Sequence, residues 1–127
     1  PIDFVTIDAS FISLRILLPV IKNWLVESGD VIALIKPQFE AGRKDAAKND
    51  GVIRDHAVHR RVLHEMMAFY QETGFSIINL VQSSIKGPKG NIEFLVHLSM
   101  GGIGKSLEEL HELILNLVPV EEETATD

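Results

Sequence analysis

The sequence predicts an α/β fold with a mainly parallel sheet, in the order strand, helix, strand, helix, strand, strand, helix. Short runs rich in β-branched and aromatic residues are typical of buried strands, and they alternate with stretches whose apolar residues recur at helical spacing. Strand–helix–strand alternation favours parallel pairing with right-handed crossovers, and the two consecutive strands near the end make the last strand antiparallel. The predicted strands are 3–7, 30–35, 75–84 and 92–100, and the predicted helices are 11–27, 56–73 and 107–118.

Local signals mark where the predicted helices begin and end. Ser10 is the expected N-cap of the first helix, and the sequence SGD ends that helix. Asp55 caps the second helix and Gly74 stops it. Ser106 and Glu109 have the spacing of a capping box in front of the last helix.

The composition is that of one ordinary globular domain. At 127 residues the chain can bury one core, and 46% hydrophobic with 24% charged residues argue against a disordered protein. The absence of cysteine excludes a disulfide framework and a thiolate metal site. No apolar stretch is long enough to span a bilayer and no signal peptide opens the chain, so we expect a cytoplasmic protein. We expect one domain at 1–118 and an acidic, disordered tail at 119–127.

Basic residues are concentrated in two loops, although the net charge is −6. Seven of the 12 Lys and Arg residues lie between Lys36 and Arg61, and the acidic excess lies in the last third. A local basic surface that binds nucleic acid is therefore compatible with the acidic total, and solvated charge in flexible loops is the alternative. The polar segment 36–54 is longer than a usual strand-to-helix connection, and such loops are commonly functional. The candidate phosphate contacts are Arg43, Lys44, Lys48, Arg54, Lys86 and Lys89.

Three ionisable residues from three predicted strands are expected at one edge of the sheet. Asp8 follows the first strand and Lys36 follows the second, at the carboxyl ends where ligands bind to parallel α/β sheets. The fourth strand runs the other way, so Glu93, near its beginning, comes to the same edge. Pro37 restricts the backbone just beyond Lys36. The sequence therefore predicts a site at this edge.

Each of these residues also has a simpler interpretation. Asp8 would serve as a helix cap, Lys36 as an exposed lysine at a strand end, and Glu93 as a charge that protects an edge strand against aggregation. These interpretations do not require the three residues to share a location, so their coincidence favours a common function. The histidines have no spacing that suits a metal site, and no metal is predicted.

Four segments of the sequence together resemble one family. In chain order they are DASFISL at 8–14, LIKPQFEAGR at 34–43, GVIRD at 51–55 and GPKGNIEFLVHL at 87–98. They are similar to the hemolysin-A-type (TlyA) RNA methyltransferases, which are relatives of the FtsJ ribose 2′-O-methyltransferases. The resemblance implies a doubly wound, Rossmann-like sheet. It also implies transfer of a methyl group from S-adenosylmethionine to a ribose 2′-hydroxyl of ribosomal RNA.

The resemblance further implies roles for the residues at the sheet edge. The family uses a Lys-Asp-Lys-Glu tetrad, in which Asp8 matches the aspartate, Lys36 the second lysine and Glu93 the glutamate. Asp8 would also face the cofactor. The first lysine and the glycine-rich cofactor turn have no counterpart, since GGIGKS at 101–106 lacks the P-loop spacing. We therefore expect only the C-terminal half of the catalytic domain, a fragment that does not bind the cofactor tightly and is inactive alone.

The implied partner is ribosomal RNA or a ribosomal subunit, and no membrane partner is expected. A second interpretation, from another class of protein, is a non-catalytic module that retains the fold and binds RNA or itself. Without an upstream neighbour the strand 3–7 would be an exposed apolar edge, so self-association through this strand is expected. A membrane-lysing role, which the family's historical name suggests, finds no amphipathic basic helix to support it.

Overall fold

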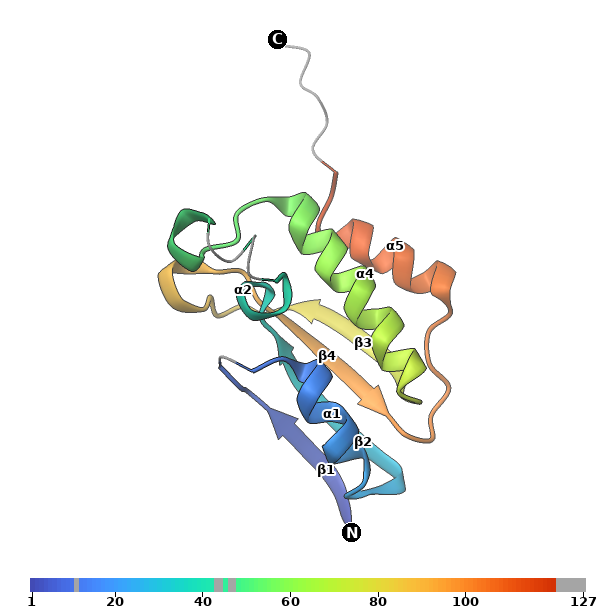
Figure 1. The fold of residues 1–127 in the computed structure, drawn as a ribbon. Coiled ribbons are helices and arrows are strands. Elements are labelled where there is room, and N and C mark those ends of the chain that lie inside the picture. Colours follow the sequence, from blue (N-terminus) through green and yellow to red (C-terminus); the bar gives the residue numbers. More distant parts are fainter. Residues whose placement is uncertain (11, 43–44, 46–47, 121–127) are drawn as a thin grey trace.

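The computed structural model of the chain describes residues 1–10, 12–42, 45 and 48–120. Its elements follow the predicted order of strands and helices (Figure 1). They are β1 (Ile2–Ile7), α1 (Leu14–Lys22), β2 (Leu25–Ile35), α2 (Pro37–Glu40), η1 (Lys48–Gly51), α4 (His56–Glu72), β3 (Ser76–Gln82), η2 (Pro88–Gly90), β4 (Phe94–Ser99) and α5 (Leu107–Leu117), where η is a 3₁₀ turn.

The four strands form one mixed sheet in the order β1-β2-β4-β3. β1 pairs with β2 in parallel, whereas β4 is antiparallel to both of its neighbours. β1, β2 and β3 therefore run in one direction, and β4 lies between β2 and β3 in the opposite direction. This arrangement confirms the predicted α/β fold with an antiparallel last strand.

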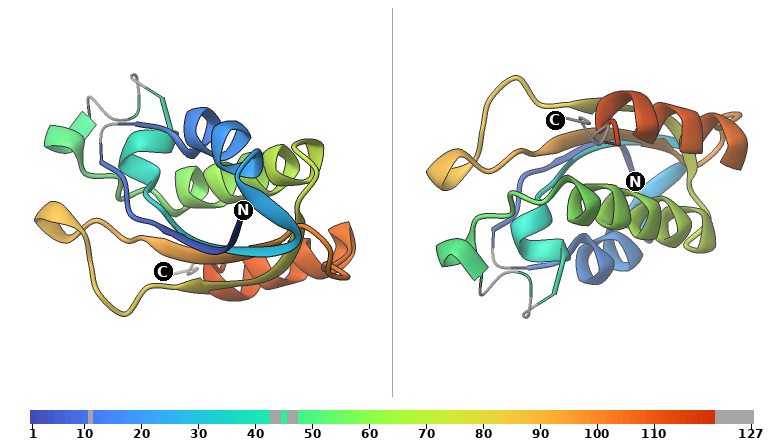
Figure 2. Two further views of the ribbon diagram at one scale, coloured as in Figure 1. Left: turned by 90° about the horizontal axis from the view of Figure 1, so that it is seen from below. Right: turned by 90° about the horizontal axis from the view of Figure 1, so that it is seen from above.

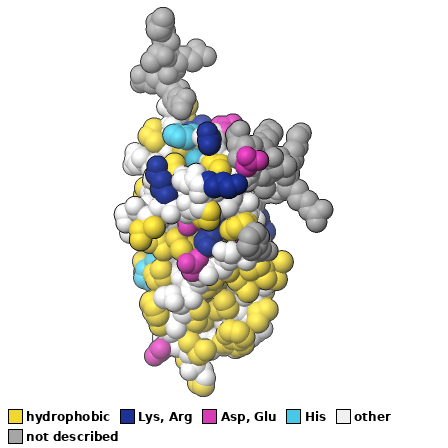
Figure 3. Space-filling view, turned by 90° about the vertical axis from the view of Figure 1, so that its left-hand side faces the viewer, with side chains coloured by type: hydrophobic (Ala, Val, Ile, Leu, Met, Phe, Trp, Pro, Cys, Tyr) yellow, Lys and Arg dark blue, Asp and Glu magenta, His cyan; other side chains and the backbone are white. Residues whose placement is uncertain are grey.

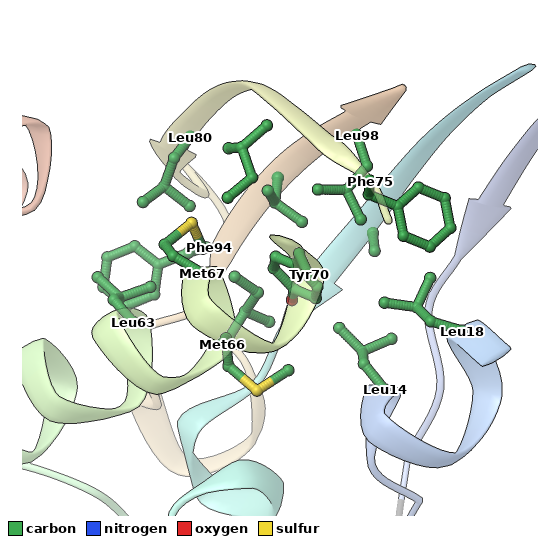
Figure 4. Close-up of a cluster of buried hydrophobic side chains, with 14 of the residues drawn as sticks. Leu14, Leu18, Leu63, Met66, Met67, Tyr70, Phe75, Leu80, Phe94 and Leu98 are labelled. Carbon is green, nitrogen blue, oxygen red and sulfur yellow. The ribbon is translucent and has the colours of Figure 1, made fainter. Parts of the chain in front are cut away.

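α1, α2 and α4 lie on one face of the sheet (Figure 2). α5 packs beside α4 next to the edge strand β3, with the rings of His64 and His111 5.3 Å apart and Leu110 and Ile114 buried in the same core. Leu14 and Leu18 of α1 point into the same space as Met66 and Tyr70 of α4 (Figure 4). The buried side chains of α4 recur every three or four residues, which is the spacing of one helical face. They are His59, Val62, Leu63, Met66, Met67 and Tyr70.

The predicted boundaries of the first helix are wrong at both ends. Ser13, not Ser10, is the N-cap of α1, and its Oγ accepts a hydrogen bond of 3.0 Å from the backbone N–H of Arg15. The helix was expected to continue to Glu27, but β2 already begins at Leu25. Leu25 pairs with Ile2 of β1, so a contact between distant segments overrides the helical spacing of the apolar residues.

The other predicted caps are confirmed. Asp55 Oδ1 accepts a hydrogen bond of 2.9 Å from the backbone N–H of Ala57 at the start of α4. Gly74, with a φ of 94°, follows the end of α4 in the left-handed conformation. Ser106 and Glu109 form the reciprocal capping box of α5, and the hydrogen bonds from Ser106 lower the pKa of Glu109.

β1 is an edge strand of the sheet. Its apolar residues Ile2 and Phe4 are 41% and 55% exposed, and within the described part of the chain no strand pairs with its outer side. This confirms the expected exposed apolar edge. None of the helices in the described ranges combines the length and the apolar character needed to cross a membrane. Of the predicted tail, residues 121–127 lie outside the described chain.

Candidate active site

The run KPQFE, residues 36–40, connects three parts of the fold. Lys36 is the N-cap of α2 and its ammonium group forms an ion pair with Asp8, just after β1. The Gln38 side chain donates a hydrogen bond to Glu93, just before β4. Glu40 accepts hydrogen bonds at the start of α1. A single turn of helix therefore connects the ends of β1 and β2, the start of β4 and the start of α1.

Lys36 is a buried lysine with polar partners. Its side chain is 10% exposed, whereas the side chain of Asp8 is 67% exposed. Besides the ion pair with Asp8, Lys36 Nζ donates to Ser10 Oγ at 3.3 Å. The interpretation of Lys36 as an exposed strand-end lysine is therefore wrong. Asp8 is not the cap of α1 either, because Ser13 occupies that position.

Glu93 lies beside Lys36 in the register of the sheet. The last pair of the antiparallel ladder between β2 and β4 is Ile35 with Phe94, so the next residues outward are Lys36 and Glu93. Glu93 is 6% exposed and precedes β4, which is an interior strand. Glu93 is therefore not a charge that protects an exposed edge strand against aggregation. Within the described chain Glu93 forms no ion pair with Lys36, and its carboxylate bonds to Gln38 instead.

The site contains two residues that the sequence did not predict. Gln38 is 6% exposed, and its Nε2 lies 2.8 Å from Glu93 Oε2. Ser10, expected to cap a helix, contacts Lys36. Both residues lie within the segments that resemble the TlyA-type methyltransferases. Each is two positions away from a predicted site residue, Ser10 from Asp8 and Gln38 from Lys36, and this proximity could have indicated them.

Asn91 joins the two loops that carry the basic residues. Its Oδ1 accepts from the Ile53 backbone N–H at 2.9 Å, and its Nδ2 donates to the backbone oxygens of Gly51 and Pro88, both at 3.1 Å. The Lys89 ammonium group donates to the Asp50 backbone oxygen at 3.1 Å. These bonds fix the turn before β4 against η1 and the segment that leads into α4.

The predicted phosphate contacts are only partly described by the structure. Arg54, Lys86 and Lys89 are exposed. Arg43, Lys44 and the side chain of Lys48 lie outside the described part of the chain. Lys and Arg side chains gather on the upper half of the face shown in Figure 3, and hydrophobic side chains cover its lower half. Within the described ranges, no group of three or more His, Asp and Glu residues could hold a metal ion.

Two histidines of α4 should make the stability of the chain depend on pH. Burial lowers the pKa of His59, and burial followed by repulsion from His111 lowers the pKa of His64, in each case from 6.5. Protonation of either histidine therefore favours the unfolded chain. We expect full stability above pH 6.5 and a loss as the pH falls through the lower pKa values of the folded state.

Urea unfolding followed between about pH 7.5 and about pH 5 measures this dependence. The variant His64→Gln should show a smaller loss of stability over this range than the wild-type chain. An unchanged midpoint of unfolding across the range would contradict the prediction.

The fold and this edge define a Rossmann-like α/β domain with an ion pair and a buried carboxylate at the carboxyl ends of its parallel strands. The model of the FtsJ-like methyltransferase family matches residues 1–100, and the chain belongs to this family. The predicted resemblance is confirmed.

The chain is also similar to individual proteins. It is 49% identical over 110 residues to "Putative rRNA methyltransferase YqxC" of Bacillus subtilis (strain 168), covering 87% of this chain and 39% of that protein. It is 33% identical over 97 residues to "16S/23S rRNA (cytidine-2'-O)-methyltransferase TlyA" of Mycobacterium tuberculosis (strain CDC 1551 / Oshkosh), covering 76% and 36%. The solved structure "Putative hemolysin from Streptococcus thermophilus" aligns with a TM-score of 0.79 and 40% identity, over 91% of this chain and 42% of that one. The chain spans less than half the length of each of these proteins.

Proposed function

We propose that this chain is the C-terminal part of the catalytic domain of an S-adenosylmethionine-dependent methyltransferase, with residues 1–118 as the domain and ribose 2′-hydroxyls of ribosomal RNA as the substrate. The observation that carries the proposal is the buried Lys36 paired with Asp8, with Glu93 next in register, at the edge where such folds bind ligands. The similarity to a protein named as an rRNA (cytidine-2'-O)-methyltransferase supports this substrate class.

The chemistry explains why a lysine and carboxylates are required together. A ribose hydroxyl is a weak nucleophile, so its proton must leave and its oxygen must be aligned with the methyl group. When bound, S-adenosylmethionine supplies an electrophilic methyl group on a positively charged sulfur. Lys36 is the residue that orients the hydroxyl and assists the departure of its proton. Asp8 holds the lysine from one side and Glu93 provides negative charge on the other.

The described residues form one wall of a cofactor site. Asp8 fits this role, because its carboxylate is largely exposed at the sheet edge and would face a cationic sulfur favourably. The connection between β1 and α1, residues 8–13, contains no glycine that would let a backbone approach a cofactor closely. We therefore propose that the chain alone neither binds S-adenosylmethionine tightly nor transfers methyl groups.

The basic loops are proposed to bind the RNA backbone. Arg54, Lys86 and Lys89 are exposed near the site, and the bonds of Asn91 hold their two loops together. Arg43, Lys44 and Lys48 are proposed as further contacts. Phosphate contacts of this kind position RNA without reading its sequence. A ribosomal RNA substrate places the protein in the cytoplasm.

The test compares the 127-residue chain with the complete protein that contains it. Each is mixed with labelled S-adenosylmethionine and with ribosomal RNA or ribosomal subunits, and 2′-O-methylation is mapped by resistance to alkaline cleavage. We expect methyl transfer by the complete protein and none by the chain alone. A complete protein that binds ribosomal RNA but transfers no methyl group would contradict the proposed enzyme.

The exposed edge of β1 favours a second candidate function, a non-catalytic module that associates with itself or with RNA. Ile2 and Phe4 are exposed on a strand whose outer side is free in the described chain, and such an edge can pair with a second copy. Sedimentation of the complete protein, together with the transfer assay, distinguishes the candidates. Dimers of the complete protein without methyl transfer would favour the module.

A further inference from the structure

Glu93 has a neutral hydrogen-bond donor in a buried position. Gln38 and Glu93 are each 6% exposed, and Gln38 Nε2 donates to Glu93 Oε2 at 2.8 Å. An amide supplies a donor without adding a positive charge, so the charge of the carboxylate remains available to a neighbouring cation. The residue next to Glu93 in register is Lys36, which supplies such a cation.

The same carboxylate is enclosed by the backbone of Gly87. A Cβ atom on Gly87 would lie 2.0 Å from Glu93 Oε2 and 3.3 Å from Gln38 Nε2, so any side chain there would displace the carboxylate. The Gly87 backbone N–H donates to the Asn91 backbone oxygen at 2.8 Å, which holds the turn in place. The Glu93 carboxylate thus accepts a hydrogen bond from Gln38, and the backbone of Gly87 packs closely against it.

Gln38 stabilises the fold poorly for a buried residue. Its Oε1 atom is buried and has no hydrogen-bond partner within the described chain. A buried acceptor without a partner is destabilising, and this offsets much of the gain from the bond to Glu93. An apolar residue of similar size would avoid this cost. The presence of an amide here points to a role in the site rather than in stability.

We propose that Gln38 is a positioning residue that holds the Glu93 carboxylate beside Lys36, and this inference rests on the proposed methyltransferase function. Lys36 and Gln38 are separated only by Pro37, whose ring restricts the backbone between them. A shift of α2 therefore moves Lys36 and the Gln38 side chain, which donates to Glu93, together. Gln38 acts through Glu93 and is not itself expected to contact the substrate.

The first test uses nuclear magnetic resonance on the 127-residue chain and does not depend on activity. The side-chain NH₂ signals of Gln38 are assigned in the wild-type chain and in Glu93→Gln, with the signals of the exposed Gln71 as the internal reference. We expect the Gln38 signals to shift in the variant and those of Gln71 to stay in place. Gln38 signals that do not respond to Glu93→Gln would overturn the inference, whatever the complete protein does.

The second test measures methyl transfer by the complete protein. Gln38→Met should lower kcat about tenfold or more with little change in KM for RNA, because the RNA contacts are unaffected while the alignment is lost. Gln71→Met, on the exposed face of α4, should leave kcat unchanged. In the Glu93→Gln background, Gln38→Met should have no further effect. A full additional loss in that background would overturn the inference, whereas an inactive wild-type protein would contradict only the proposed function.

Discussion

Lys36→Ala is expected to lower methyl transfer by the complete protein about a thousandfold, which is the range for loss of a residue that handles the proton. Lys36 is the only cation that forms an ion pair with Asp8 within the described chain, and it lies next to Glu93 in register. Its removal leaves the hydroxyl without the group that orients it. Single-turnover transfer from labelled S-adenosylmethionine to ribosomal RNA measures the effect on the chemical step.

Lys105→Ala is the matched control for this prediction. Lys105 follows β4, which runs away from the site edge, and the contact it makes to Ile77 comes from its backbone N–H rather than its side chain. We expect this variant to transfer methyl groups at the wild-type rate. Equal losses in Lys36→Ala and Lys105→Ala, or no loss in either, would remove Lys36 from the mechanism.

Glu40→Ala is expected to lower the free energy of unfolding of the chain by about 3 kcal/mol, because it removes a buried, charged acceptor from several donors. Glu40 accepts from Ser13 Oγ at 2.5 Å and from the Leu14 backbone N–H at 2.9 Å. Arg15 Nη1 lies 3.4 Å from the same carboxylate. The alanine variant removes the acceptor of the Ser13 hydroxyl and of the Leu14 backbone N–H, and so weakens the attachment of the start of α1 to α2. Urea unfolding measures the difference.

Glu65→Ala provides the comparison for Glu40. The Glu65 side chain is 50% exposed and forms longer ion pairs, 3.7 Å to Arg15 and 3.9 Å to Arg61. Exposed pairs of this kind contribute little, so we expect a change within about 0.5 kcal/mol. If the two variants lose the same stability, the buried carboxylate is not what attaches α1 to α2.

Features that depend on local sequence were predictable. The spacing of apolar residues in α4 is that of a helical face, and the caps at Asp55 and Ser106 follow from residue type and position. The end of α1 was not predictable in this way, because Leu25 is drawn into β2 by pairing with Ile2. No local signal indicates which strand a given residue will pair with.

In the candidate site, too, some features could be predicted from the sequence and others depend on contacts between distant residues. Strand direction alone brings Asp8, Lys36 and Glu93 to one edge of the sheet, because it decides which end of each strand lies there. The bond between Gln38 and Glu93 joins residues that are 55 positions apart, and nothing in either residue's neighbourhood specifies it. Three-dimensional contacts of this kind became visible only in the folded structure.

The place of β4 in the sheet has a consequence for synthesis of the chain. β4 lies between β2 and β3 but is made after both, so the sheet keeps an open gap until the last of the four strands leaves the ribosome. Pairing across such distances in the sequence is slow, and nascent chains with unfilled strand edges are prone to aggregate. Lys36 and Glu93 flank the ladder between β2 and β4. The pairing of β4 with β2 and β3 therefore closes the gap and also brings Glu93 beside Lys36. A nascent chain that lacks β4 has neither a closed sheet nor a complete site.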